Sequence, residues 1–159
     1  MKRAFALFLL LPVLLLNGCV PYLIASVMSV PEDAVVASLG DFETEEYYTS
    51  GGFQDFTDYA KYTYRSVDFD RNEYFEKITP YSKKAFLEHV ENFEMWVETI
   101  EEYEPENDLV VGYDFDVSVI TEDDYIYILD DPFYNYLGCY DMYLFDMETM
   151  TLHYFHNNI

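Results

Sequence analysis

Residues 79–103 read TPYSKKAFLEHVENFEMWVETIEEY. Apolar side chains recur in this stretch every three or four residues, which places them on one face of an α-helix. Thr79 and Pro80 are typical of a helix N-terminus, as the N-cap and the first helical residue, and Ser82 is an alternative N-cap. Pro105 predicts that the helix ends just ahead of it. The apolar face consists of Phe86, Val90, Phe93, Val97 and Ile100, widened by Leu87 and Trp96.

After this helix the period of the apolar residues changes to two, which is typical of half-buried β-strands. Turn signals at residues 122–124 and 147–150 separate the expected strands. The sequence therefore predicts an α+β fold, with one long amphipathic helix packed on an antiparallel meander of about four strands. These strands are expected over residues 109–119, 125–129, 140–146 and 151–156.

The region between the start of the domain and the helix gives weaker signals. Residues 59–69 alternate weakly and are expected to form a strand, and residues 73–78 are expected to form a short helix. Residues 34–60 give no clear secondary structure from their pattern.

The first residues resemble a bacterial export signal. Met1-Lys2-Arg3 is basic, and an uncharged run extends from Ala4 to Leu16. The residues that end this run, Leu16, Asn17, Gly18 and Cys19, resemble the lipobox of bacterial lipoproteins. The resemblance implies cleavage before Cys19 and a diacylglycerol on the Cys19 sulfur, with acyl chains such as palmitate that hold the protein on a membrane. Because Val20 follows the cysteine, it also implies the outer membrane if the envelope has two.

An uncleaved membrane anchor is the alternative, since residues 4–30 carry no charge. Both interpretations place the remaining chain outside the cytoplasm, attached to a bacterial membrane. The expected organisation is a signal peptide over residues 1–18, a lipidated tether over 19–33 and a single acidic α+β domain over 34–159.

The charge of the chain is strongly one-sided. Of its eight Lys and Arg residues, two precede the cleavage site, so the mature chain has six against 31 Asp and Glu, a net charge of −25. All six lie between Lys61 and Lys84, and residues 85–159 contain no Lys or Arg. This charge excludes nucleic acid as a partner and favours cationic ligands or basic proteins, with solubility as the alternative explanation.

One acidic stretch resembles a calcium-binding EF-hand loop. Oxygen donors stand at alternate positions, with a backbone carbonyl expected at the fourth of them. The candidate ligands are Asp68, Asp70, Asn72, Tyr74 and Glu76. The stretch lacks the usual glycine and the final bidentate glutamate, so an exposed acidic turn is the alternative. No cofactor other than calcium is expected.

Other groups with chemical potential are sparse. Asp114 and Asp116 would lie roughly 7 Å apart on one face of the expected strand 109–119, which suits a carboxylate-based hydrolase. Ordinary solvent-facing carboxylates are the alternative. His153 and His156 are expected on opposite faces of a strand, so they cannot share a metal.

The tyrosines Tyr125, Tyr127, Tyr140, Tyr143 and Tyr154 fall on adjacent expected strands. They form a candidate aromatic binding face for a sugar or a peptide, with burial in the core as the alternative. Cys139 has no base beside it in the sequence and is expected to be a buried structural cysteine. We therefore expect a non-enzymatic binding domain whose partner is an envelope protein, a glycan or a cationic ligand. A calcium-responsive module and a hydrolase remain as alternatives.

Overall fold

The computed structural model describes residues 32–51, 56–130 and 138–158. The lipobox and almost all of the expected tether lie outside the described residues. The chain divides into two compact units, Met1–Ala34 and Val35–Ile159. The second unit contains the sheet and the long helix, and among the described residues no helix has the length and apolarity needed to cross a membrane.

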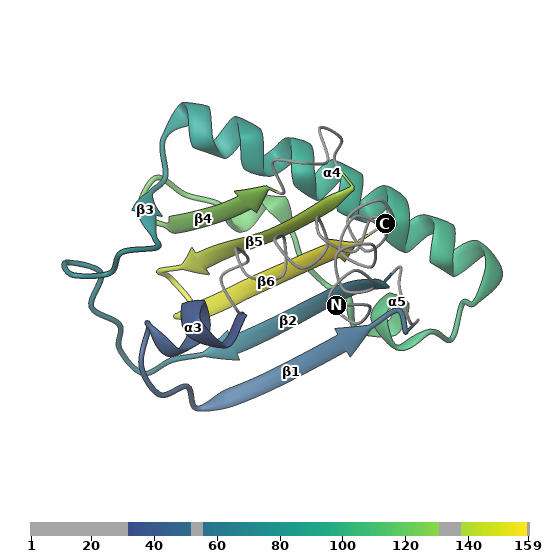
Figure 1. Cartoon of the computed structure of the whole chain (residues 1–159), viewed down its shortest axis with the longest axis horizontal. Helices are drawn as coiled ribbons and strands as arrows, with labels where there is room; N and C mark the ends of the chain where they lie inside the picture. The colour runs from purple at the N-terminus through teal and green to yellow at the C-terminus, as the bar shows by residue number, and fades with distance from the viewer. Residues whose placement is uncertain (1–31, 52–55, 131–137, 159) are drawn as a thin grey trace, which may run out of the picture. The chain divides into compact units, whose positions relative to one another are not determined.

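One antiparallel sheet organises the second unit (Figure 1). In spatial order its six described strands are β1, β2, β6, β5, β4 and β3. Strands β4, β5 and β6 are three of the four strands of the predicted meander. Strands β1 and β2 pair as a hairpin beside β6, and β3 pairs with β4 at the opposite edge. The strand bounds are Thr44–Thr49 (β1), Phe56–Thr63 (β2), Glu76–Lys77 (β3), Tyr125–Asp130 (β4), Cys139–Asp146 (β5) and Thr151–Asn158 (β6).

The predicted long helix is confirmed as α4, Pro80–Tyr103. Thr79 is its N-cap: the Thr79 hydroxyl accepts from the Ser82 amide at 3.1 Å, and the Ser82 hydroxyl accepts from the Thr79 amide at 2.9 Å. The two candidate caps therefore act together as a capping box, which satisfies two amides at the helix end. Figure 1 shows α4 running across one face of the sheet.

The core lies between α4 and that face, as the amphipathic pattern predicts. Phe155 on β6 is at its centre and is completely buried. Its ring packs against the rings of Phe86 and Phe93 from the helix at centroid distances of 5.8 and 5.3 Å. Tyr59 on β2 and Phe115 complete the cluster at 5.3 and 5.0 Å. The two layers are thus joined mainly by aromatic packing.

The expected strand over residues 109–119 is wrong. This segment contains the short helix α5, Asp108–Gly112, and the 3₁₀ turn η1, Val117–Val119. The Asn107 side chain caps α5 by accepting from the Leu109 amide at 3.0 Å, and Asp116 caps η1 by accepting from the Ser118 amide at 2.8 Å. These local caps favour short helical turns over the strand that the alternating apolar pattern predicts. Each cap supplies a hydrogen-bond acceptor to a backbone amide that, in a strand, would need an acceptor from a neighbouring strand.

Gly112 adds a packing reason for the same correction. A Cβ atom at this position would lie 2.1 Å from Cδ1 of Tyr48. The backbone therefore approaches the Tyr48 ring on β1 more closely than any residue with a side chain could.

The fold class is confirmed, but the strand count of about four is too low. The short helix expected over residues 73–78 is also wrong, because Asn72 Oδ1 accepts from the amides of Tyr74 and Phe75 and closes a turn. The next two residues pair with β4 as strand β3. The weak strand expected over 59–69 corresponds to β2, which starts at Phe56 and ends at Thr63. The short helix α3, Glu32–Ala37, precedes β1.

Candidate functional site

The sheet register brings three of the predicted tyrosines side by side on the face opposite α4. Tyr127, Tyr143 and Tyr154 occupy neighbouring positions on β4, β5 and β6, with ring centroids 5.9 and 4.9 Å apart. Tyr125 shares this face and stacks on Phe69 at 3.9 Å. Tyr143 and Tyr154 are buried, whereas Tyr125 and Tyr127 are half-buried.

The fifth predicted tyrosine lies on the other face. Tyr140 is buried beneath α4, where its hydroxyl lies 3.3 Å from the carbonyl oxygen of His89 and 3.3 Å from Oδ1 of Asn92. His89 itself is buried and its Nδ1 donates to the Ala85 carbonyl at 2.9 Å. The five tyrosines therefore do not form one continuous face.

Tyr127 forms part of a surface hollow of about 470 Å³ between the first turns of α4 and the β3–β4 edge. Two residues of the expected calcium loop, Tyr74 and Glu76, line the same hollow. Tyr81, on the first turn of α4, completes the aromatic lining and is 85% exposed. The hollow thus combines residues from two sequence predictions that had no apparent connection.

Two other side chains of the expected calcium loop, Asp68 and Asn72, make hydrogen bonds within the protein. Asp68 Oδ1 accepts from the Asp70 amide at 3.0 Å, and the Asn72 side-chain amide donates to the Ser38 hydroxyl at 2.9 Å. Within residues 32–51, 56–130 and 138–158, no group of three or more His, Cys, Asp and Glu residues is arranged to hold a metal ion. The loop has the form of an acidic turn that leads into β3.

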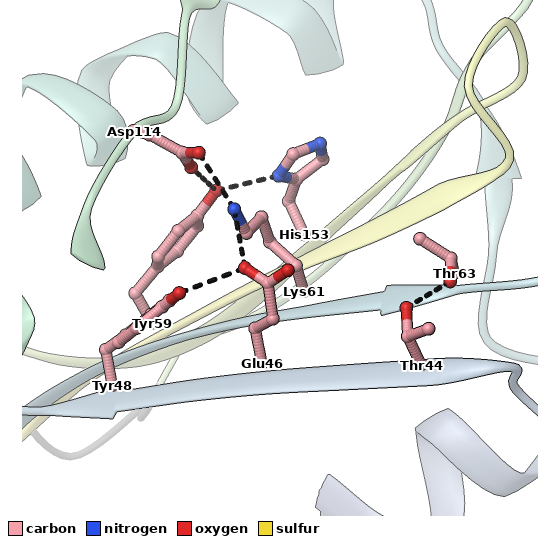
Figure 2. Close-up of polar contacts among 8 residues, drawn as sticks. All are labelled: Thr44, Glu46, Tyr48, Tyr59, Lys61, Thr63, Asp114 and His153. Carbon is pink, nitrogen blue, oxygen red and sulfur yellow. Dashed lines mark hydrogen bonds and ion pairs between the residues drawn. The ribbon is translucent and has the colours of Figure 1, made fainter.

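A polar network on the α4 side of the sheet contains Asp114 (Figure 2). The Lys61 ammonium on β2 lies 2.9 Å from Glu46 Oε2 on β1 and 2.8 Å from Asp114 Oδ2, which follows α5. Burial lowers the pKa of Lys61, but the hydrogen bonds and charges of Asp114 and Glu46 outweigh it and raise the pKa overall. Lys61 therefore stays protonated and ties three segments together.

Tyr59 and His153 extend the network into the core. The Tyr59 hydroxyl lies 2.9 Å from His153 Nδ1 and 3.3 Å from Asp114 Oδ1 (Figure 2). Burial raises the pKa of Tyr59, and the nearby Asp114 charge raises it further. Burial lowers the pKa of His153 to about 4, so the imidazole is neutral at pH 7.

These protonation states favour hydrogen bonding within the network. Lys61 is an ammonium, Tyr59 is a neutral phenol, and His153 Nδ1 is occupied by Tyr59. Asp114 and Asp116 are not on a common strand, and Asp116 is an exposed cap whose pKa is lowered by the Ser118 amide. The strand geometry that suggested a paired-carboxylate hydrolase is therefore absent here.

His156 lies on the opposite face from His153, as predicted. Its Nδ1 is 2.7 Å from Asp141 Oδ1 on β5, and the Tyr154 hydroxyl donates to the same oxygen at 2.8 Å. Asp58, on β2, lies opposite His156 of β6 in the strand register and accepts from the Tyr47 hydroxyl at 2.7 Å. This polar row of Asp58, Asp141 and His156 was not predicted, although the period-two spacing in β2, β5 and β6 could have indicated it.

Two buried atoms of the polar row, Asp58 Oδ1 and His156 Nε2, have no hydrogen-bond partner in the described part of the chain. An Asp–His pair can orient a general base, but His156 Nε2 contacts no hydroxyl or thiol among the described residues. Cys139 begins β5 and is half-buried, with its Sγ 3.4 Å from Asn158 Oδ1, so it is more exposed than expected.

The most one-sided charge lies on the outer side of α4 and just beyond its C-terminus. We call this the α4 acidic surface: Glu91, Glu98, Glu101, Glu102, Glu104, Glu106 and Asp108. All seven side chains are exposed, and none takes part in the ion pairs found among the described residues.

The basic residues close to α4 are engaged elsewhere. Lys84 lies 3.5 Å from Glu88, Lys83 donates to the Ile120 carbonyl at 2.8 Å, and Lys77 pairs with Asp123 at 3.1 Å. They lie at or before the first two turns of the helix, far from the acidic surface along the chain. The lysines of α4 therefore lie in its first two turns, whereas its glutamates run from Glu88 to the last turn.

Comparisons of the chain with protein-family models, with curated proteins and with solved structures gave no match.

Proposed function

We propose that the protein is a membrane-anchored extracytoplasmic lipoprotein with a non-enzymatic binding domain, and that the α4 acidic surface binds a cationic partner. The anchor rests on the resemblance of residues 16–19 to a lipobox. The binding role rests on the charge arrangement of α4, which opposes the helix dipole at both ends.

This arrangement is the observation that carries the proposal. Acidic residues stabilise a helix near its N-terminus and basic residues near its C-terminus, because they complement the partial charges of the backbone. In α4 the first turn has no acidic residue and the last turn has no basic residue, while Glu101 and Glu102 lie in the last turn. The helix therefore carries charges that weaken it, without an internal partner to compensate.

Solubility alone does not require this placement. Thirty-one carboxylates already give the chain a large negative charge, and those at a helix C-terminus could be placed elsewhere at less energetic cost. A bound cation would neutralise the surface and complement the dipole at once. A partner with several spaced ammonium groups, such as a lysine-rich segment, fits the length of the surface.

The polar network supports a binding role over a hydrolytic one. Lys61, Tyr59 and His153 are held in protonation states that favour mutual hydrogen bonding, and their interactions join β1, β2, β6 and the segment after α5. Such a network fixes the shape of the domain without activating a substrate.

The test is calorimetric titration of the full chain, in an uncharged maltoside detergent at low salt, with octalysine as the probe. We expect the variant Glu98→Gln/Glu101→Gln/Glu102→Gln to bind octalysine about tenfold more weakly than the wild type. The matched control is Glu73→Gln/Glu122→Gln/Glu148→Gln, which removes the same charge from exposed positions elsewhere. Equal weakening in both variants would mean that the net charge of the chain alone determines the affinity for octalysine. That result would refute a localised binding surface.

A further inference from the structure

The surface hollow beside β3 and β4 has a composition distinct from the α4 acidic surface. Its lining includes three tyrosine rings, the imidazole of His89, one carboxylate and several aliphatic side chains, and no Lys or Arg. The residues used below are Tyr74, Tyr81, Tyr127, Glu76, Ile126 and Ile128. A volume of about 470 Å³ accommodates a small organic molecule.

The aromatic rings offer their faces and edges at different angles. Tyr74 and Tyr127 meet at 63° with centroids 5.6 Å apart, which makes a corner of two rings. Tyr81 is 85% exposed and belongs to a different element, the first turn of α4. Aromatic faces attract organic cations through the ring quadrupole, most strongly when several rings surround the charge.

The carboxylate of Glu76 provides the matching negative charge. It is exposed and has no hydrogen-bond or ion-pair partner in the part of the chain that the structure describes. The neighbouring Lys77 is paired with Asp123 and does not neutralise it. A cation in the hollow would therefore meet an uncompensated carboxylate beside the aromatic corner.

An anion would find few donors at this end of α4. The amides of Ser82 and Lys83 donate to Thr79, at 3.1 Å to its hydroxyl and 2.8 Å to its carbonyl. The Lys83 ammonium donates to the Ile120 carbonyl. Two of the amides that usually make a helix N-terminus attractive to anions are thus already used, and Pro80 has no N–H.

A primary ammonium would also be poorly satisfied. It has three N–H donors, whereas Glu76 is the one carboxylate of the lining and the Ser82 hydroxyl is committed to the capping box. A quaternary ammonium has no N–H donor and is weakly hydrated, so it loses little by leaving water for aromatic surface.

We propose that this hollow binds a small soluble quaternary ammonium compound, with the three tyrosine rings around its methyl groups and Glu76 as the counter-charge. The strongly negative chain repels the phosphate of a zwitterionic lipid headgroup, which favours a soluble compound over a membrane lipid. This site is separate from the α4 acidic surface and does not depend on the proposed function.

The test is titration of the full chain, in maltoside detergent, with choline chloride, monitored by calorimetry. The neutral isostere 3,3-dimethyl-1-butanol has the same shape without the charge, and ethanolamine supplies a primary ammonium on the same hydroxyethyl group. We expect saturable choline binding and at least tenfold weaker binding of both comparison compounds.

Variants locate the site. Glu76→Gln and Tyr81→Ala should each weaken choline binding, by about two- to fivefold for the loss of one exposed ring, whereas Tyr81→Phe should retain it. Tyr103→Ala is the matched control, since Tyr103 is 79% exposed at the other end of α4. Equal binding of the neutral isostere, or unchanged choline binding by both Glu76→Gln and Tyr81→Ala, would overturn the proposal.

The two proposals fail independently. Neutralising Glu98, Glu101 and Glu102 should reduce octalysine binding and leave choline binding unchanged. Tyr81→Ala should weaken choline binding and leave octalysine binding unchanged. A variant that changes both affinities equally would contradict the assignment of two separate sites.

Discussion

The variant Glu101→Gln/Glu102→Gln should be more stable than the wild type. Both side chains lie in the last turn of α4, where the helix dipole is negative, and no basic residue is present in that turn. Because they are exposed, we use the low end of the dipole effect, about 0.3 kcal/mol each, which gives a gain of about 0.6 kcal/mol in the free energy of unfolding at low ionic strength.

This gain is measurable as a thermal shift. For a folded unit the size of Val35–Ile159, about 1 kcal/mol corresponds to roughly 4 °C, so Tm should rise by about 2 °C in 20 mM salt. The shift should largely disappear in 1 M NaCl, where the screening length is about 3 Å. Circular dichroism melts of the full chain in maltoside detergent measure both quantities.

Glu88→Gln is the control, because Glu88 lies nearer the N-terminus of α4 and pairs with Lys84 at 3.5 Å. Its removal should leave Tm unchanged or slightly lower. A fall in Tm for the Glu101/Glu102 variant, or a rise that persists in 1 M NaCl, would refute the reasoning from the helix dipole.

Four further outcomes follow from individual residues. Thr79→Ala should lower the free energy of unfolding by about 1 kcal/mol in denaturant titrations, because it removes half of the α4 capping box. Burial holds the pKa of His153 near 4, against about 6.5 in an unfolded chain, so stability present above pH 6.5 should decline by up to about 3 kcal/mol as the pH falls to 4, and His153→Gln should reduce that decline. Cys19→Ala should abolish incorporation of labelled palmitate in a bacterial host. Calcium and magnesium at equal millimolar concentrations should raise Tm equally, and Asp68→Ala/Asp70→Ala should not separate them.

Each of these has a clear contrary result. An unchanged denaturation midpoint for Thr79→Ala would mean that the capping box does not stabilise the fold. An identical pH profile of stability for His153→Gln would mean that other groups cause the loss of stability in acid. Palmitate incorporation without Cys19 would exclude the lipobox. A calcium-specific shift lost in the double alanine variant would restore the EF-hand interpretation.

Local signals made α4 and strands β4 to β6 predictable. Thr79-Pro80 marks the start of the helix, the apolar residues from Phe86 to Ile100 keep one period, and the turn at 147–150 lies between two alternating segments. These features involve residues within a few positions of each other, so their physical causes are visible in the sequence.

Long-range packing decided the parts that were not predicted. Gly112 lies against Tyr48, 64 positions earlier, and Lys61 pairs with Asp114, 53 positions later. The alternating pattern around them is compatible with a strand, but the caps at Asn107 and Asp116 select short helical turns. Strands β1 and β3 are short or exposed, so they lack a strong apolar alternation.

The candidate site was predicted only in pieces. Tyr127 was expected on a binding face and Tyr74 and Glu76 in a metal loop, but only the pairing of β3 with β4 places them around one hollow. Nothing in the sequence singles out Tyr81, which lies between Pro80 and Ser82 at the expected helix start. The α4 acidic surface, in contrast, follows directly from a predictable helix and its sequence of charges.

The most direct test of the binding role is to melt the wild type and the Glu98→Gln/Glu101→Gln/Glu102→Gln variant with and without saturating octalysine. A ligand that binds the folded state raises Tm in proportion to its affinity. Without ligand, the variant should have the higher Tm. Octalysine should raise the Tm of the wild type more than that of the variant, which reduces or reverses the difference in Tm between them. An equal octalysine shift in the two proteins would contradict the claim that the α4 acidic surface is a binding site.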